Sequence, residues 1–217
     1  MSEQQRTVSF QDEAPQLGVY LIIRYESSLY QRFLNDIIAG RSVLENYGGR
    51  LACVASEVEL VENFWPGQKL PAMLWFPAED LAERWLASDK VIKQPDWLNG
   101  VDIIMVPATR RAASDKNVFS FMDVQVRDGK SFKEYVEGSL PGAEKANCTP
   151  AIALSPEPAK LRGPWNPGLV VINQWNSKDQ FYQWFESAEY QPWKEKRHSC
   201  SESNFVVFEG TPTSPRK

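Results

Sequence analysis

The chain has few of the residues and motifs from which metal, nucleotide and hydrolase sites are built. Its 217 residues include one histidine, His198, and three cysteines without a CxxC spacing. A structural zinc site needs such closely spaced ligands, so we expect no metal site. The patterns GxGxxG, GxxxxGKS/T, HExxH and GxSxG do not occur, and nothing therefore predicts a dinucleotide, P-loop, zinc-peptidase or serine-hydrolase site. We expect no cofactor.

The chain also lacks a basic excess and any long apolar run. Its formal net charge is −4, whereas phosphate-binding surfaces usually carry a surplus of Lys and Arg, so we expect no nucleic-acid partner. No apolar run reaches the roughly 20 residues of a membrane span, and the polar start of the chain lacks the apolar core of a secretory signal. An odd number of cysteines suits reduced thiols. These features predict a soluble, cytoplasmic protein.

One stretch of the sequence occurs twice. Residues 69–97 and 168–193 each read as an apolar strand, a turn, an amphipathic helix and a run to Gln-Pro. Trp85 and Trp184 occupy matching places in the two copies, at an offset of 99 residues (184 − 85 = 99). A repeat of this length is typical of a duplicated small domain rather than of a solenoid unit.

Each half of the chain predicts the element order βαββαβ. The first half comprises residues 17–109 and the second comprises residues 116–211, with the polar sequence TRRAASDK between them. This order is that of a ferredoxin-like α+β unit, in which both helices cover one face of the sheet. We expect the two uncovered sheet faces to pack against each other, so that two tandem units close one barrel within a single chain.

Local signals predict where several elements begin and end. Residues 50–61 read as one strand, and residues 155–168 read as a proline-rich connection. Pro192 predicts the end of the last helix, which would leave residues 194–200 (KEKRHSC) as a basic loop.

The first helix of the second half carries three further signals. Ser131 with Glu134 forms a capping box, Val136 takes the place of the apolar Ile37 of the first half, and Pro141 predicts a kink or an early end. Further capping boxes are Ser28 with Gln31 and Ser177 with Gln180.

Five parts of the chain carry motifs of a known family. They are residues 132–146 and 173–193, Arg197, the closing strand 205–210, and residues 45–54 in the first half. They resemble DUF1330, a domain-of-unknown-function family of the dimeric α/β-barrel superfamily. Its members usually form the barrel by dimerising, so the resemblance implies a fused dimer. The superfamily includes cofactor-free isomerases, cyclases and monooxygenases.

The two halves keep different parts of this family pattern. The first half keeps Gly48-Gly49-Arg50, where the second half reads Asn147-Cys148-Thr149. The second half keeps Arg197 and Glu209-Gly210, which have no match in the first half. If only one half works, we expect it to be the second half.

The basic segment after the last predicted helix offers the main candidates for chemistry. Histidine exchanges protons near neutral pH, and an arginine holds anionic or carbonyl oxygens. We assign the catalytic roles to His198 and Arg197, and we expect Glu209 and Trp165 at the same pocket mouth. The alternative is a solvated basic loop without chemistry.

Two opposite charges occupy matching positions on the first strand of each half. Arg24 and Asp123 are 99 residues apart (123 − 24 = 99), each within an apolar strand. A charge buried in such a strand is costly unless it is paired. We expect mutual pairing or a polar, ligand-binding patch inside the barrel, and the alternative is that both lie at the solvent end of their strands.

Four of the eight tryptophans fall into two groups. Trp85 and Trp184 lie on the apolar faces of helices and are expected in the core. Trp65 and Trp165 lie in proline-containing turns and are expected to anchor loops or cover a pocket mouth. Truncating Trp184 is therefore expected to cost more stability than truncating Trp165.

These features predict binding of a small organic molecule, with cofactor-free isomerase, cyclase or oxygenase chemistry. The alternative is a non-catalytic structural or interaction module. A concave apolar cavity with converging polar groups would favour an enzyme, and fully packed halves would favour a scaffold.

Overall fold

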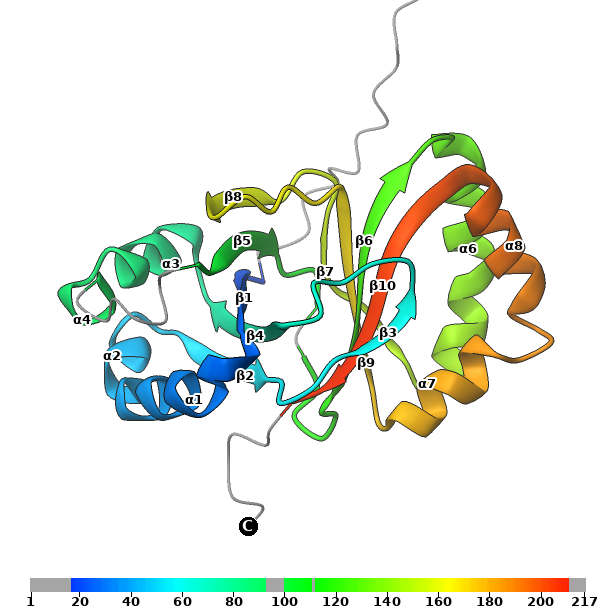
Figure 1. The fold of residues 1–217 in the computed structure, drawn as a ribbon. Coiled ribbons are helices and arrows are strands. Elements are labelled where there is room, and N and C mark those ends of the chain that lie inside the picture. The colour runs from blue at the N-terminus through cyan, green and yellow to red at the C-terminus, as the bar shows by residue number, and fades with distance from the viewer. Residues whose placement is uncertain (1–16, 93–99, 111, 211–217) are drawn as a thin grey trace, which may run out of the picture.

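The computed structural model describes residues 17–92, 100–110 and 112–210 (Figure 1). The strands are β1 (Val19–Glu26), β2 (Arg50–Val54), β3 (Glu59–Glu62), β4 (Lys69–Phe76), β5 (Asp102–Pro107), β6 (Val118–Val126), β7 (Thr149–Ser155), β8 (Ala159–Arg162), β9 (Leu169–Trp175) and β10 (Ser201–Glu209). The helices are η1 (Ser27–Leu29), α1 (Tyr30–Ala39), α2 (Arg41–Asn46), α3 (Glu79–Leu86), α4 (Asp89–Ile92), α6 (Gly129–Lys145), α7 (Lys178–Phe185) and α8 (Gln191–Cys200).

The strands form two antiparallel sheets of five strands each. The first sheet has the order β2-β4-β1-β5-β8 and the second has the order β7-β9-β6-β10-β3. Strands that occupy the same place in the two orders differ by five in their numbering, as β1 and β6 do in the centre of each sheet. Figure 1 shows the sheets in the middle of the molecule and the helices on their outer sides. The α+β class and the antiparallel sheets agree with the sequence-based expectation.

The fifth strand of each sheet comes from the other half of the chain. β3 pairs with β10, and β8 pairs with β5. The expectation of one strand over residues 50–61 is therefore wrong, because the chain leaves the first sheet after β2 and joins the second sheet at Glu59. The connection expected over residues 155–168 likewise contains β8. Each exchanged strand covers an edge of the other sheet and pairs backbone groups that would otherwise stay open.

The two sheets share one apolar core. β1 alternates between its faces, so that Tyr20 and Ile22 point into this shared core while Leu21 and Ile23 point towards the helices of the first half. From the second half, Phe121, Ile172 and other apolar side chains enter the same core. The sheets therefore face each other within one chain.

Two isolated backbone bridges join the sheets at their corners. Ala55, just after β2, bridges to Gly210, just after β10. Ala108, just after β5, bridges to Ala153 in β7. These bridges and the exchanged strands tie the two sheets together at opposite edges.

A separate apolar core lies between each sheet and its helices. In the first half it includes Phe33 of α1 and Trp85 of α3. In the second half it includes Phe181 of α7, Tyr135 of α6 and Trp175 of β9. Within the described ranges, no helix is both long enough and apolar enough to cross a membrane.

Three helix ends, two on α6 and one on α1, differ from their sequence-based assignment. Asp128, and not Ser131, caps α6 by accepting hydrogen bonds from the backbone N–H groups of Lys130 and Ser131. The helix continues through Pro141 to Lys145, so the expected early end is wrong. The expected cap at Ser28 is also wrong, because residues 27–29 form a 3-10 turn before α1.

Ser177 does cap α7, accepting a hydrogen bond from the N–H of Gln180 at 3.2 Å. Of two neighbours on α6, Tyr135 is buried, while Val136 is 43% exposed. The offset of 99 residues therefore holds at Phe132, which is buried like Phe33, but it fails at Val136.

Residues 191–200 form helix α8 and not a basic loop. Pro192 lies in the first turn of this helix, where its missing N–H has no intrahelical acceptor to lose. The residue taken as a helix end is thus a helix start.

The segment between the halves is fixed by one buried amide side chain. Gln174 of β9 accepts a hydrogen bond from the N–H of Ala113 at 2.8 Å. Its amide nitrogen donates to the carbonyl oxygens of Ala113 at 2.8 Å and Lys116 at 2.7 Å. The linker is therefore part of the packed structure.

The structure reverses the expected order of two tryptophan substitutions. Trp165 is 7% exposed and packs in the core between the sheets, whereas Trp184 is only partly buried against the helix-side core. Trp165→Ala should lower the free energy of unfolding by about 3–5 kcal/mol, as expected for a large ring truncated to a cavity. Trp184→Ala should cost less. Urea denaturation with matching m-values measures both losses, and a larger loss at Trp184 would contradict this packing.

Candidate functional site

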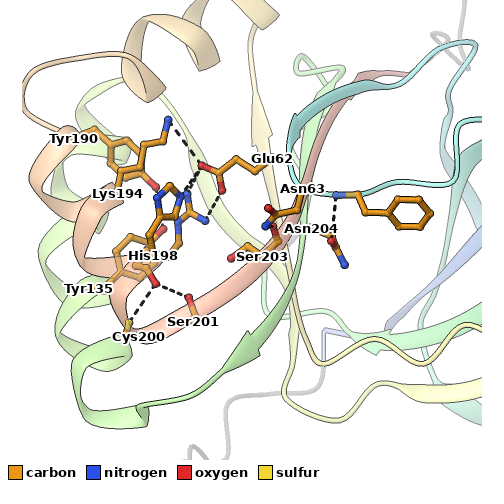
Figure 2. A network of polar contacts seen from close by, with 12 residues as sticks. Glu62, Asn63, Tyr135, Tyr190, Lys194, His198, Cys200, Ser201, Ser203 and Asn204 are labelled. Atoms are coloured by element: carbon orange, nitrogen blue, oxygen red, sulfur yellow. Dashed lines mark hydrogen bonds and ion pairs between the residues drawn. The ribbon is translucent and has the colours of Figure 1, made fainter.

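A cluster of charged and phenolic side chains lies between β10 and helices α6 and α8. Its carboxylate, Glu62, comes from the first half of the chain on the exchanged strand β3 (Figure 2). Glu62 lies opposite Phe205 of β10, with a shift of register next to this pair. Strand exchange therefore places a residue of the first half beneath a helix of the second.

Arg197 of α8 holds Glu62 at both carboxylate oxygens. Nη1 donates to Oε2 at 2.7 Å, and Nη2 donates to Oε1 at 2.9 Å. Arg197 is 0% exposed, and its guanidinium also lies 5.7 Å from the ring centroid of Phe205. A paired, bidentate contact of this kind compensates for the burial of both charges.

The pair shifts the proton affinities of both partners. Burial alone would raise the pKa of Glu62, but the hydrogen bonds and charges of Arg197 and His198 outweigh it and hold that pKa below its ordinary value. Burial would lower the pKa of Arg197, but the net shift is upward, and the hydrogen bonds to Glu62 are the largest cause that opposes burial. Both groups are therefore charged in the folded protein near neutral pH.

Two further basic side chains of α8 face the same carboxylate. His198 Nε2 lies 3.0 Å from Glu62 Oε1, and the histidine side chain is 51% exposed. Lys194 Nζ lies 3.8 Å from the same oxygen and 4.0 Å from the ring centroid of Phe185. Figure 2 shows Lys194 and His198 both directed at Glu62. The carboxylate thus orients an accessible imidazole.

Two tyrosines line the buried side of the cluster. The hydroxyls of Tyr135 on α6 and Tyr190 are 3.2 Å apart, and both residues are buried. Burial raises the pKa of Tyr190, with Tyr135 adding to the effect and Arg197 opposing it. Tyr190 therefore stays protonated and can donate a hydrogen bond.

Two buried polar atoms of the cluster have no hydrogen-bond partner within the part of the chain that the structure describes. They are Arg197 Nε and Ser203 Oγ. Ser203 is 2% exposed and, two residues before Phe205, lies on the same side of β10 as Phe205. An unpaired buried polar group costs about 1–3 kcal/mol. Both atoms can donate a hydrogen bond to water or to a ligand oxygen.

Close helix packing sets the position of Arg197. The ring of Trp193 lies against Gly138 of α6, where an added Cβ would come within 2.0 Å of it. At the other end of α8, Arg127 Nη2 donates to the carbonyl oxygens of His198 at 2.9 Å and Ser201 at 3.0 Å. The helix carrying Arg197 and His198 is therefore fixed at both ends.

A second polar cluster lies in the core between the sheets. Arg24 of β1 donates from Nε and Nη2 to Asp102 Oδ2 of β5, at 3.2 and 2.9 Å. The Arg24 guanidinium stacks 3.8 Å from the ring centroid of Trp165 and lies 5.3 Å from that of Trp65. Asp123 accepts hydrogen bonds from Trp165 Nε1 at 3.4 Å and the N–H of Gly168 at 2.8 Å.

This second cluster is buried and internally paired. Arg24 and Asp123 are each 8% exposed, so they do not lie at the solvent ends of their strands. Burial lowers the pKa of Arg24, while Asp102 and, through its charge, Asp123 oppose this shift. The expected polar patch is present, but Asp102 makes the close ion pair with Arg24. The patch holds the tryptophan-bearing turns of both halves in the core.

The residues assigned to one pocket mouth do not meet. Arg197 and His198 lie together at the start of β10. Glu209 lies at the far end of this strand, where it accepts a hydrogen bond from Asn117 at 2.7 Å. Trp165 lies on the other face of the sheet, in the core between the sheets. The expectation of a shared pocket mouth is therefore wrong. The length of β10 separates Glu209 from Arg197 and His198, and Trp165 lies on the opposite face of the sheet.

The residues that sequence reasoning missed are Glu62, Lys194, Tyr135, Tyr190 and Ser203 of this cluster, and Asp102 of the central one. Glu62 could not be assigned because its strand pairs with a sheet distant in sequence. Asp102 left a signal, since it is the one charged residue in the apolar run of residues 101–106. The structure places it opposite Arg24 in the antiparallel pairing of β1 with β5. Within the described ranges, no group of His, Cys, Asp and Glu is arranged to hold a metal ion.

Comparison with known proteins supports the fold. Residues 117–211 match the family Domain of unknown function (DUF1330), and no curated protein matches the chain. A proposed monooxygenase from Lactobacillus acidophilus NCFM is 11% identical with a TM-score of 0.52, covering 88% of this chain and 93% of that one. An anthrone oxidase-like protein is 9% identical with a TM-score of 0.50, covering 94% and 98%.

A mutant chlorite dismutase from Candidatus Nitrospira defluvii in complex with cyanide is 7% identical, with a TM-score of 0.51. That match covers 91% of this chain and 92% of the other. At these identities the similarity is one of fold: two antiparallel sheets with helices, of the dimeric α/β-barrel type.

The lowered pKa of Glu62 predicts a pH dependence of stability. Between its lowered pKa and its ordinary value of 4.5, the unfolded chain binds more protons at Glu62 than the folded one. The free energy of unfolding should therefore rise with pH in this window, and the contribution is lost as pH falls. In Glu62→Gln this slope should be smaller than in the wild type.

Glu202→Gln is the matched control, because that carboxylate is on β10 but 68% exposed and 4.0 Å from Arg127. In denaturant titrations from pH 3 to 6, Glu202→Gln should keep the wild-type dependence of the free energy of unfolding on pH. Equal slopes for Glu62→Gln and the wild type would contradict the buried pair.

Proposed function

We propose that the protein binds a small organic molecule beside α8 and transfers a proton on it. His198 is the acid–base group, and Glu62 is the residue that orients it. The observation that carries this proposal is the contact of 3.0 Å between His198 Nε2 and Glu62 Oε1, with Glu62 itself held at both oxygens by Arg197. A base oriented by a fixed third group is the arrangement on which proton-transfer sites rely.

The arrangement assigns separate roles to the two ring nitrogens. Nε2 is engaged with Glu62, so Nδ1 is the nitrogen that remains for a ligand. The half-exposed ring gives a ligand access from solvent, while Arg197 and the phenols keep the inner side polar. Loss of a proton next to a carbonyl, or from a phenol, begins isomerisation, cyclisation and cofactor-free oxygenation alike. The named relatives of similar fold include a proposed monooxygenase and an anthrone oxidase-like protein, which is compatible with this class.

We further infer that the chain is a tandem duplication with one working site. The matching strand orders support this, as do Gly48 and Asn147, which share a left-handed backbone with φ of 71° and 57° at an offset of 99 residues (147 − 48 = 99). Glu62 is the last residue of β3. The corresponding strand β8 ends instead at Arg162, which is exposed. The first half therefore lacks the carboxylate that the second half receives.

A structural role is the second candidate. The bidentate contact between Arg197 and Glu62 fixes the exchanged strand β3 to the second half. A clamp of this kind accounts for the ion pair, but it requires neither an accessible histidine nor unpaired buried donors.

Deuterium exchange tests the proposal directly. Small ketones and 2-oxo acids that raise the thermal midpoint of the protein would be incubated with it in D2O, and loss of the signals of their acidic C–H groups followed by NMR. The wild type should accelerate exchange, and His198→Gln should reduce this rate at least about 100-fold while binding persists.

Glu195→Gln provides the control, since it removes an exposed charge from the same helix. It should exchange at the wild-type rate. If His198→Gln exchanges as fast as the wild type, or if no compound is bound or exchanged, the proton-transfer proposal fails and the clamp remains.

A further inference from the structure

We propose that the molecule bound beside α8 is an anion that carries a carboxylate, held by Lys194 and by the unpaired donors Arg197 Nε and Ser203 Oγ. This inference rests on the proposed site and specifies the chemical class of its ligand.

The first argument is the charge around Glu62. Its single carboxylate neutralises Arg197, whose nitrogens lie at 2.7 and 2.9 Å. Lys194 Nζ approaches the same carboxylate only to 3.8 Å, and His198 adds positive charge whenever it is protonated. The neighbouring Lys196 is balanced by its own partner, Glu134. Glu62 can neutralise only one of the positive charges around it, so that of Lys194 remains, and this favours a negatively charged ligand.

The second argument is the nature of the unpaired atoms. An arginine Nε–H can only donate a hydrogen bond, and a serine hydroxyl can donate one. Both atoms are buried, on residues that are 0% and 2% exposed. Because no described residue accepts from them, both atoms remain available to donate a hydrogen bond to an oxygen of the ligand. A carboxylate offers acceptors only.

The third argument is the position of Lys194. Its side chain is 25% exposed and lies over the ring of Phe185, so the stem is fixed by packing while the ammonium group stays accessible. It therefore lies between solvent and the buried pair, where it can meet an incoming anion. Lys194→Met would remove the charge and keep an apolar chain of similar length over the ring.

The test uses charged probes and uncharged probes of the same shape. Benzoate and 2-oxobutyrate would be compared with benzamide and 2-butanone by titration calorimetry at fixed ionic strength. At least one carboxylate should bind ten-fold or more tightly than its uncharged counterpart. Lys194→Met should remove this preference, and Lys133→Met, which deletes a 55%-exposed charge on α6, should retain it.

Ser203→Ala separates a ligand contact from a structural one. Because Ser203 Oγ has no partner among the described residues, this variant should not lower the thermal midpoint of the unliganded protein. It should weaken binding of the carboxylate several-fold. A lowered midpoint with unchanged affinity would overturn the role of Ser203.

Three further outcomes would overturn the inference: neither carboxylate binds, the uncharged probes bind as tightly, or Lys133→Met weakens binding as much as Lys194→Met. The failure of the anion proposal is distinguishable from that of the proposed function. If a neutral ketone exchanges its protons at a rate that depends on His198 but is unchanged in Lys194→Met, only the anion proposal is refuted. If carboxylates bind in a way that depends on Lys194 but no bound compound exchanges its protons, only the proton-transfer proposal is refuted.

Discussion

The exchange of the short strands β3 and β8 is the constraint on which the rest of the structure depends. Each sheet is completed by a strand from the other half, so neither half has all of its edges covered alone. The turns that follow these strands carry Trp65 and Trp165 into the core between the sheets. The same exchange brings Glu62 beneath α8. Fold and candidate site thus rest on one set of contacts.

The ion pair at this crossing has consequences for both stability and function. A buried arginine without its carboxylate is strongly destabilising, by about 3–5 kcal/mol in comparable pairs. A well-packed apolar pair in the same place is often as stable, so stability alone does not explain the charges. The accessible His198 and the unpaired Ser203 give the pair a chemical environment that a structural clamp does not need.

Much of the fold could be predicted because its signals are local. The apolar run Val19–Tyr25 is a buried central strand, and Ser177 caps the helix it precedes. The errors arose where one signal has two meanings or where the partner is distant. Proline is found both after the end of a helix and in the first turn of the next. Pro192 therefore predicted a helix end, although it lies in the first turn of α8. The repeat offset placed Phe132 correctly but not Val136, because its neighbour Tyr135 lies in the core instead.

The candidate site was half predictable for the same reason. Residue type and the difference between the halves pointed to Arg197 and His198, which the structure places side by side on one carboxylate. The carboxylate itself comes from a strand about 135 residues earlier in the chain (197 − 62 = 135). Local periodicity carries no information about such a partner, and the shift of register beside Glu62 obscures the face on which it lies.

Cleavage of the linker tests most directly whether the halves are held by exchanged strands and a shared core. The chain would be divided at residues 112–114 by producing the two fragments together, and the product examined by size-exclusion chromatography and thermal unfolding. The account predicts that both fragments elute together at the size of the intact chain and unfold in one transition. Fragments that separate and remain folded as independent monomers would contradict it.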